Sequence, residues 1–195
     1  MDEPRSAVPP VEGILGTPDL GARLERWVAE ARSGDAAASR TRARWLRIQS
    51  EESATFAGVL IDLAERTARV AVHTRAGRRH RGVIAVVAVD FCAVRTDRGH
   101  DVLVAYRGIA SVRPDADIPG PSGDRLVHSD VALAEMLSIL NADRPRLLVM
   151  TTVGDEGLAG ELRSVGRDVI TLRLDGASRA PVYVPIDTIA EITLV

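Results

Sequence analysis

The sequence contains no lysine, a single cysteine and very few aromatic residues. All 25 basic residues are arginine, and Phe, Trp and Tyr together make up 3% of the 195 residues. With Cys92 alone, neither an internal disulfide nor a cysteine-based zinc site can form. The apolar runs are far shorter than the roughly 18 residues that a membrane-spanning helix needs. Because the chain also lacks a basic and apolar leader, these absences predict a soluble protein of the reducing cytoplasm.

The overall charge is small, but its distribution along the chain is uneven. Residues 1–35 hold 4 arginines and 7 acidic residues, a net charge of −3. Residues 36–113 hold 14 and 7, a net charge of +7, and residues 114–195 hold 7 and 13, a net charge of −6. The formal total of −2 therefore conceals a basic middle and an acidic end. With 46% hydrophobic residues, the chain is expected to fold rather than remain disordered.

The first part of the chain is expected to lie outside any β domain. Residues 1–16, rich in proline and glycine, predict a disordered tail. Residues 17–19 then supply a capping hydroxyl, a proline and an acid, which is typical of the start of a helix. A helical arm is expected over 17–50, in which Ser33-Gly34 ends the first helix. From Asp35 to Leu63 the sequence predicts one long helix or two helices broken near Ser50. Residues 114–128 have the composition of a linker.

The rest of the chain contains an internal repeat. Leu60 aligns with Leu137 at an offset of 77, and the offset grows to 78 at Gly82 and Gly160 and to 80 further on. An offset that changes only at turns is what a divergent duplication produces. Each copy is predicted to hold one helix and then five short strands rich in Val, Ile, Leu and Thr. The expected strands are 69–75, 79–88, 90–96, 101–106 and 109–113, then 146–152, 157–166, 168–174, 180–184 and 187–194.

This pattern resembles the Sm-like (LSm-type) small β-barrel. The family's first motif has a turn glycine followed by a glycine where the second strand bends, and Gly77 with Gly82 matches it, as does Gly154 with Gly160. Its second motif is a short turn before the last strand, which residues 106–109 (Tyr-Arg-Gly-Ile) resemble. The resemblance implies an α+β, mainly β fold of two five-stranded Sm/SH3-like barrels, at 51–113 and 129–195, each preceded by its helix.

The resemblance also implies assembly through edge strands, by which a tandem chain would build a ring from three subunits. It does not carry over a base-binding pocket. Sm proteins usually place Asp-x-x-Met-Asn after the second glycine, and the asparagine helps to hold an RNA base. The aspartate position is occupied here by Ala88 and Gly166, and neither corresponding loop contains Asn or Gln.

The candidate contact residues are arginines of the first copy. Residues 66–81 contain six arginines and no acid, and most are expected on a β-hairpin. Such a surface attracts phosphate groups. An arginine-only composition is also typical of a GC-rich genome. The same cluster of arginines is expected of a solvated hairpin and of a surface that binds an acidic partner. The second copy has Asp155-Glu156 at the equivalent turn, so the copies are electrostatically complementary. The residues proposed to contact nucleic acid or an acidic partner are Arg66, Arg69, Arg75, Arg78, Arg79, Arg81 and Arg107.

No pattern indicates catalysis, a metal or a cofactor. The four histidines do not form a helical metal pair. Cys92 lies in an apolar run and is expected to be a core residue, while Asp90 and Asp168 are expected to bond backbone groups at the bend between the second and third strands. The sequence therefore predicts a non-enzymatic binding or assembly protein that presents its barrels to a protein partner or to itself. The alternative is an RNA- or DNA-binding protein that uses the hairpin 75–81.

Overall fold

The computed structural model describes residues 20–115, 120, 123–127, 129–154, 156–176 and 180–195. The tail expected at 1–16 lies outside these residues, as does part of the linker expected at 114–128. The chain divides into two compact units, Met1–Leu46 and Arg47–Val195.

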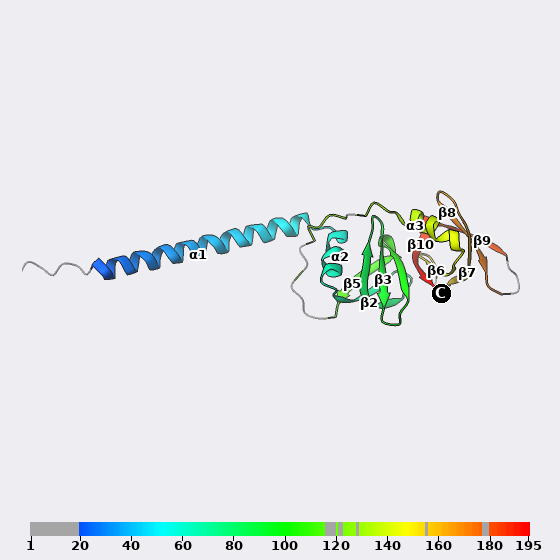
Figure 1. Ribbon diagram of the computed structural model, residues 1–195, viewed down its shortest axis with the longest axis horizontal. Coiled ribbons are helices and arrows are strands. Elements are labelled where there is room, and N and C mark those ends of the chain that lie inside the picture. The colour runs from blue at the N-terminus through cyan, green and yellow to red at the C-terminus, as the bar shows by residue number, and fades with distance from the viewer. Residues whose placement is uncertain (1–19, 116–119, 121–122, 128, 155, 177–179) are drawn as a thin grey trace, which may run out of the picture. The chain divides into compact units, whose positions relative to one another are not determined.

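Helix α1 (Leu20–Ser53) accounts for the described part of the first unit and continues into the start of the second (Figure 1). It is one helix of 34 residues, so the stop expected at Ser33-Gly34 is wrong. Because α1 ends at Ser53 and the next helix begins at Phe56, the alternative of two helices broken near Ser50 is confirmed. The segment is rich in alanine and arginine and has no proline, and nothing in it therefore breaks the backbone ladder. Among the described residues, no helix has both the length and the apolar character needed to cross a membrane.

The second unit contains two successive sets of elements in the same order. The first half consists of α2 (Phe56–Glu65), β1 (Arg69–Thr74), β2 (Arg79–Val87), β3 (Phe91–Thr96), β4 (Asp101–Ala105), the 3-10 turn η1 (Tyr106–Gly108) and β5 (Ile109–Pro114). The second half consists of α3 (Leu133–Leu140), η2 (Asn141–Asp143), β6 (Arg146–Thr151), β7 (Leu158–Val165), β8 (Val169–Leu174), β9 (Pro181–Pro185), η3 (Ile186–Thr188) and β10 (Ile189–Leu194). All ten expected strands are confirmed, and their ends lie within two residues of the expected positions.

The two halves also share their irregularities. A bulge interrupts the β2–β3 pairing between Ile84 and Val86, and the β7–β8 pairing between Leu162 and Ser164. A Cβ atom at Gly82 or at Gly160 would overlap a backbone carbonyl oxygen of the next strand, so both strands bend where only glycine fits. The repeat thus extends from the order of the elements to the details of the strand pairing.

The expectation of two closed five-stranded barrels is wrong. All ten strands form one antiparallel open sheet in the order β5-β1-β2-β3-β4-β10-β6-β7-β8-β9. Within the first half β5 pairs with β1 only, and β4 takes β10 of the second half as its other neighbour. Periodicity in a sequence indicates which face of a strand is buried, but it does not indicate which strand pairs along a free edge.

The pairing of β4 with β10 is called the joint below. It consists of three register pairs: Val104 with Glu191, Leu103 with Ile192 and Val102 with Thr193. Because the joint uses one edge from each half, it leaves the opposite edges, β5 and β9, at the two ends of the sheet.

Two hydrophobic cores lie on opposite faces of the strands next to the joint. One core lies within the first half and includes Leu60, Val70, Cys92, Val94 and Val104. The other is built mainly from the second half, yet it also takes Phe91, Ala93, Leu103 and Ala105 from β3 and β4. Since successive side chains of a strand point to opposite faces, β3 and β4 are buried on both sides.

Candidate functional site

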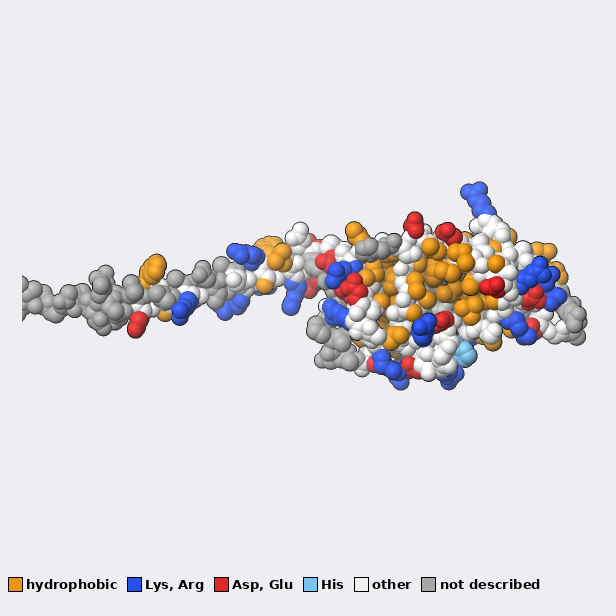
Figure 2. Space-filling model, in the orientation of Figure 1, with side chains coloured by type: hydrophobic (Ala, Val, Ile, Leu, Met, Phe, Trp, Pro, Cys, Tyr) orange, Lys and Arg blue, Asp and Glu red, His pale blue; other side chains and the backbone are white. Residues whose placement is uncertain are grey.

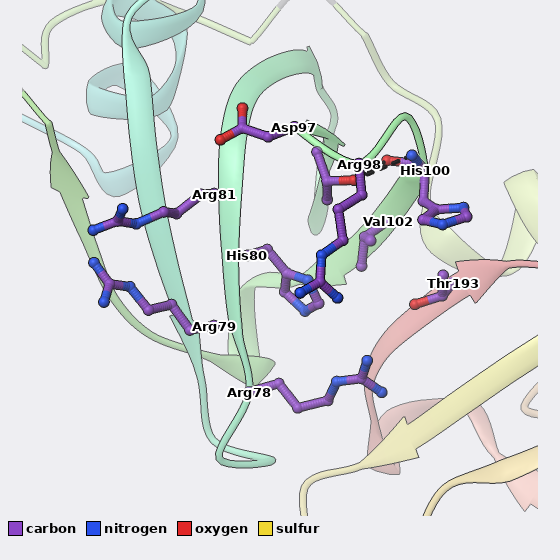
Figure 3. Close-up of a pocket in the computed structure, with 10 residues that line it drawn as sticks. Arg78, Arg79, His80, Arg81, Asp97, Arg98, His100, Val102 and Thr193 are labelled. Carbon is purple, nitrogen blue, oxygen red and sulfur yellow. Dashed lines mark hydrogen bonds between the residues drawn. The ribbon is translucent and has the colours of Figure 1, made fainter.

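The predicted arginines of the hairpin point to two different sides of β2. Arg75 lies in the β1–β2 turn and is exposed, and Arg79 and Arg81 are exposed along β2. Figure 3 shows the side chains of Arg79 and Arg81 directed away from Arg78 and the intervening His80. This alternation follows from the two-residue period of a strand.

The other three predicted residues are held elsewhere. Arg69 begins β1 and makes an ion pair with Asp97, with 2.6 Å between Nη2 and Oδ2. Arg107 lies in η1 and donates a hydrogen bond to the backbone carbonyl of Ile186 in the second half. Arg66 is the residue that ends α2. The seven predicted arginines therefore do not form one patch, and Arg107 fastens the two halves together.

Two turns of the same design lie beside the hairpin arginines. In Thr-Arg-Ala-Gly-Arg (74–78), the Arg78 N–H donates to Oγ1 of Thr74 at 3.3 Å, and Gly77 has φ +72°. In Thr-Asp-Arg-Gly-His (96–100), the His100 N–H donates to Oγ1 of Thr96 at 3.1 Å, and Gly99 has φ +83°. A left-handed residue before the last position is what glycine permits. Each turn thereby fixes the backbone of a residue with a basic side chain, Arg78 or His100.

The two turns and strand β10 enclose an open pocket of about 560 Å³. Arg78 and His80 approach from the hairpin, Arg98 and His100 from the β3–β4 turn, and Thr193 from β10 (Figure 3). Val102 supplies an apolar wall. The pocket is thus lined by both halves and exists only because the joint brings β10 beside β4.

A buried carboxylate lies beneath this pocket. The Glu191 side chain is 0% exposed; its Oε2 lies 2.9 Å from Nε2 of His80, and its Oε1 lies 3.2 Å from Nε of Arg78. A carboxylate deprived of water needs such partners, because an isolated buried charge is very costly. Glu191 was not among the residues predicted from the sequence. The signal was an acid between Ala190 and Ile192 in a strand whose other polar residue is Thr193.

Other residues considered for chemistry have structural roles. Burial raises the pKa of Cys92 to about 12, so the thiol is protonated and unreactive near neutral pH. Oδ1 of Asp90 accepts a hydrogen bond from the Leu133 N–H at 2.8 Å, which fixes the start of α3. Tyr106 donates from its hydroxyl to the Ala88 carbonyl at 2.6 Å, and desolvation raises the pKa of this phenol.

Neither a metal site nor a known relative identifies a chemistry for the chain. Within the described ranges, no three His, Cys, Asp or Glu side chains are grouped so that they could hold a metal ion. No family model, no curated protein and no solved structure matches the sequence. The resemblance to Sm-like proteins therefore stays a prediction.

Proposed function

We propose that this chain is a non-enzymatic binding and assembly protein of the cytoplasm, which associates with further copies of itself through the two open edges of its sheet. The joint carries this proposal. The joint pairs β4 of the first half with β10 of the second half. The two strands left at the open edges, β5 and β9, occupy the equivalent positions in the other copy of the repeat. At the offset of 80, β9 corresponds to β4 and β5 corresponds to β10.

The counterpart residues define the expected pairing between chains. Following the register of the joint, Ser111 pairs with Val184, Val112 with Tyr183 and Arg113 with Val182 of the neighbouring copy. The edge strands are open to solvent in the single chain: Tyr183 is 68% exposed, and Ser111 and Arg113 are exposed. A sheet edge with free backbone groups is a template for pairing with another chain.

Charge favours the same arrangement. Across the joint, the basic turn with Arg78 meets the acidic residue Glu191. Between copies the signs are reversed, because the equivalent turn of the second half has Asp155-Glu156 in the sequence and β5 carries Arg113. Complementary charge of this kind orients two partners and suppresses other pairings.

The contact between copies is expected to be weaker than the joint. A Cβ atom at Gly108 would overlap the backbone of Ala190, so the joint depends on glycine for its close approach. The residue equivalent to Gly108 in the second half is Thr188, and β9 is bounded by Pro181 and Pro185, which have no backbone N–H. We therefore expect reversible association that depends on protein concentration.

Apolar surface is available to further macromolecular partners. Figure 2 shows apolar side chains gathered over one face of the second unit, with charged side chains around them. The exposed apolar residues of that unit include Phe56, Val86, Val89 and Ile139. Large apolar surfaces rimmed by polar groups mark interaction sites more often than chance allows.

Light scattering after size-exclusion chromatography tests the proposal. The full chain is expected to show a mass that rises with concentration above 20.9 kDa. Arg113→Glu is expected to reduce association, as is Asp155→Arg/Glu156→Arg, and the triple variant is expected to regain it. Ile139→Asp, an exposed change on α3, is the matched control. A mass of 20.9 kDa at every concentration would overturn the proposal.

RNA or DNA binding through the hairpin 75–81 is the second candidate function. Arg79 and Arg81 favour it, since both side chains are exposed on one side of β2 and form no ion pair within the described part of the chain. The measurement is the anisotropy of a labelled single-stranded RNA. Binding that falls steeply with salt and disappears in Arg79→Glu/Arg81→Glu would favour nucleic acid.

A further inference from the structure

We propose that the pocket between the β1–β2 turn, the β3–β4 turn and β10 binds a phosphate-bearing small molecule through its phosphate group. The inference does not depend on self-association, because every residue it uses lies in one chain. It rests on the convergence of four nitrogen-bearing side chains on one hollow: the guanidinium groups of Arg78 and Arg98 and the imidazoles of His80 and His100.

The pocket offers hydrogen-bond donors that the protein does not use up. Arg78 approaches Glu191 through Nε, at 3.2 Å, which leaves its two terminal amino groups available. Arg98 is exposed and has no ion pair among the described residues. Oγ1 of Thr193 is buried and has no hydrogen-bond partner in the part of the chain that the structure describes. A planar guanidinium is well suited to the oxygens of a phosphate group.

The two acidic groups at the pocket, Asp97 in its lining and Glu191 beneath it, each have a basic partner, which reduces their repulsion of an anion. Asp97, which lies in the β3–β4 turn, is bound to Arg69 at 2.6 Å. Glu191 is buried beneath the pocket, where it holds His80 and Arg78 in place. The groups that face the hollow are therefore mainly cationic or donating, and the carboxylate below them acts to position the donors.

The dimensions favour a small molecule. A volume of about 560 Å³ lies within the range of pockets that bind small ligands, and it exceeds what a single phosphate group needs. The hollow has no Phe, Tyr or Trp among its described lining residues, so a stacked nucleobase is not the primary recognition element. Recognition is expected to centre on phosphate oxygens.

Isothermal titration calorimetry of the full chain with inorganic pyrophosphate tests the inference. Saturable binding at one site per chain is expected, and Arg98→Gln is expected to weaken it by at least about tenfold, the effect of losing a charged hydrogen bond. Arg75→Gln is the matched control, because it removes the same type of exposed side chain from the β1–β2 turn at a position outside the pocket lining. This control is expected to change the affinity by no more than about twofold. Melting curves of both free variants verify that they are folded.

A second readout links the ligand to the joint. Because the pocket includes residues of both halves, pyrophosphate is expected to raise the melting temperature of the chain and to lose this effect in Arg98→Gln. Absence of binding, or equal affinity in the wild type and Arg98→Gln, overturns the inference. Equal losses in Arg98→Gln and Arg75→Gln also overturn it, since they indicate a diffuse basic surface. If pyrophosphate does not bind, while a single-stranded RNA binds and loses affinity in Arg98→Gln, the phosphate source is nucleic acid and the small-molecule site is rejected.

Discussion

Strands β3 and β4 of the first half and their counterparts β8 and β9 of the second half have the same pairing register but different burial. Phe91, Ala93, Leu103 and Ala105 are all buried in the second core. Their counterparts in the second half include Thr171 and Tyr183, and Tyr183 is 68% exposed. The same backbone scaffold therefore has two covered faces in one copy and one covered face in the other. What differs is whether a neighbouring half is present.

The fifth strands differ in the same way. In β10 the residues Ala190, Glu191 and Ile192 are buried, whereas Ala110 and Ser111 of β5 are exposed. At equivalent positions, β10 in the joint has the acid Glu191, and β5 at the open edge has the hydroxyl residue Ser111. The duplicated halves have thus kept their strand pairing and diverged in the side chains along their edges.

Substitutions at the strand bends that both halves share are expected to change the free energy of unfolding the most. Gly82→Ala and Gly160→Ala should each lower the free energy of unfolding by about 3 kcal/mol, because the new Cβ overlaps a carbonyl oxygen of the adjacent strand. Urea denaturation measures both. Gly77→Asn is the control: Gly77 has φ +72° and open space around it, and asparagine tolerates this conformation at a cost of under about 1 kcal/mol. A severe effect in one half with none in the other would contradict equal packing of the two bends.

Substitutions at the fifth strands, where the halves differ, are expected to change the free energy of unfolding by an intermediate amount and in one half only. Glu191→Ala should lower the free energy of unfolding by about 2 kcal/mol, because it leaves His80 and Arg78 without their buried carboxylate. This value is below that for a fully buried pair, since Arg78 is 38% exposed and water can solvate it. Ser111→Ala, at the equivalent position, should stay within about 0.5 kcal/mol. The same urea series measures both, and equal effects would remove the distinction between the edges.

The smallest expected effect concerns a surface cluster of the second half. A hydrogen bond from Arg163, together with the charge of nearby Arg173, lowers the pKa of Glu161. Because the folded pKa lies below the unfolded one, the stabilisation is present above the ordinary glutamate pKa and is lost as pH falls through the folded value. The first half has Val83 at the equivalent position and lacks this acid sensitivity.

NMR titration of the Glu161 carboxyl group measures this effect. Its pKa is expected below the ordinary glutamate value in the native chain and closer to that value in Arg163→Gln. Arg167→Gln, an exposed change nearby in the sequence, is the control and should leave the pKa unchanged. A pKa that does not respond to Arg163→Gln would show that the hydrogen bond is not its cause.

The positions of the strands could be predicted from the sequence. Whether the strands close into two barrels or join into one open sheet could not. Glycines at 77, 82, 154 and 160 and the runs of branched residues between them define local structure, which depends on nearby residues only. Whether β4 pairs with β5 or with β10 depends on contacts between residues far apart in the chain. The apolar run from Phe91 to Val94 did indicate that β3 is buried on both faces. A strand with one solvated face alternates apolar and polar residues, and this run does not.

The candidate site was predictable only in part. Clustering of arginines drew attention to the hairpin, and Arg78 does line the pocket. The sequence did not indicate Arg98, His100 and Thr193, because they come from a second turn and a distant strand. Nor did it separate Arg79 and Arg81 from Arg78, since a one-residue step along a strand reverses the direction of a side chain.

The joint also determines the order in which the chain can complete its fold during synthesis. Strand β4 ends at Ala105, and its partner β10 begins only at Ile189. Until the ribosome has made β10, the first half has an unpaired edge at β4 and an uncovered apolar face formed by Phe91, Ala93 and Leu103. The first half is therefore the part of the nascent chain that is prone to aggregation. Its edge and its apolar face become covered when β10, the last strand of the second half, inserts between β4 and β6.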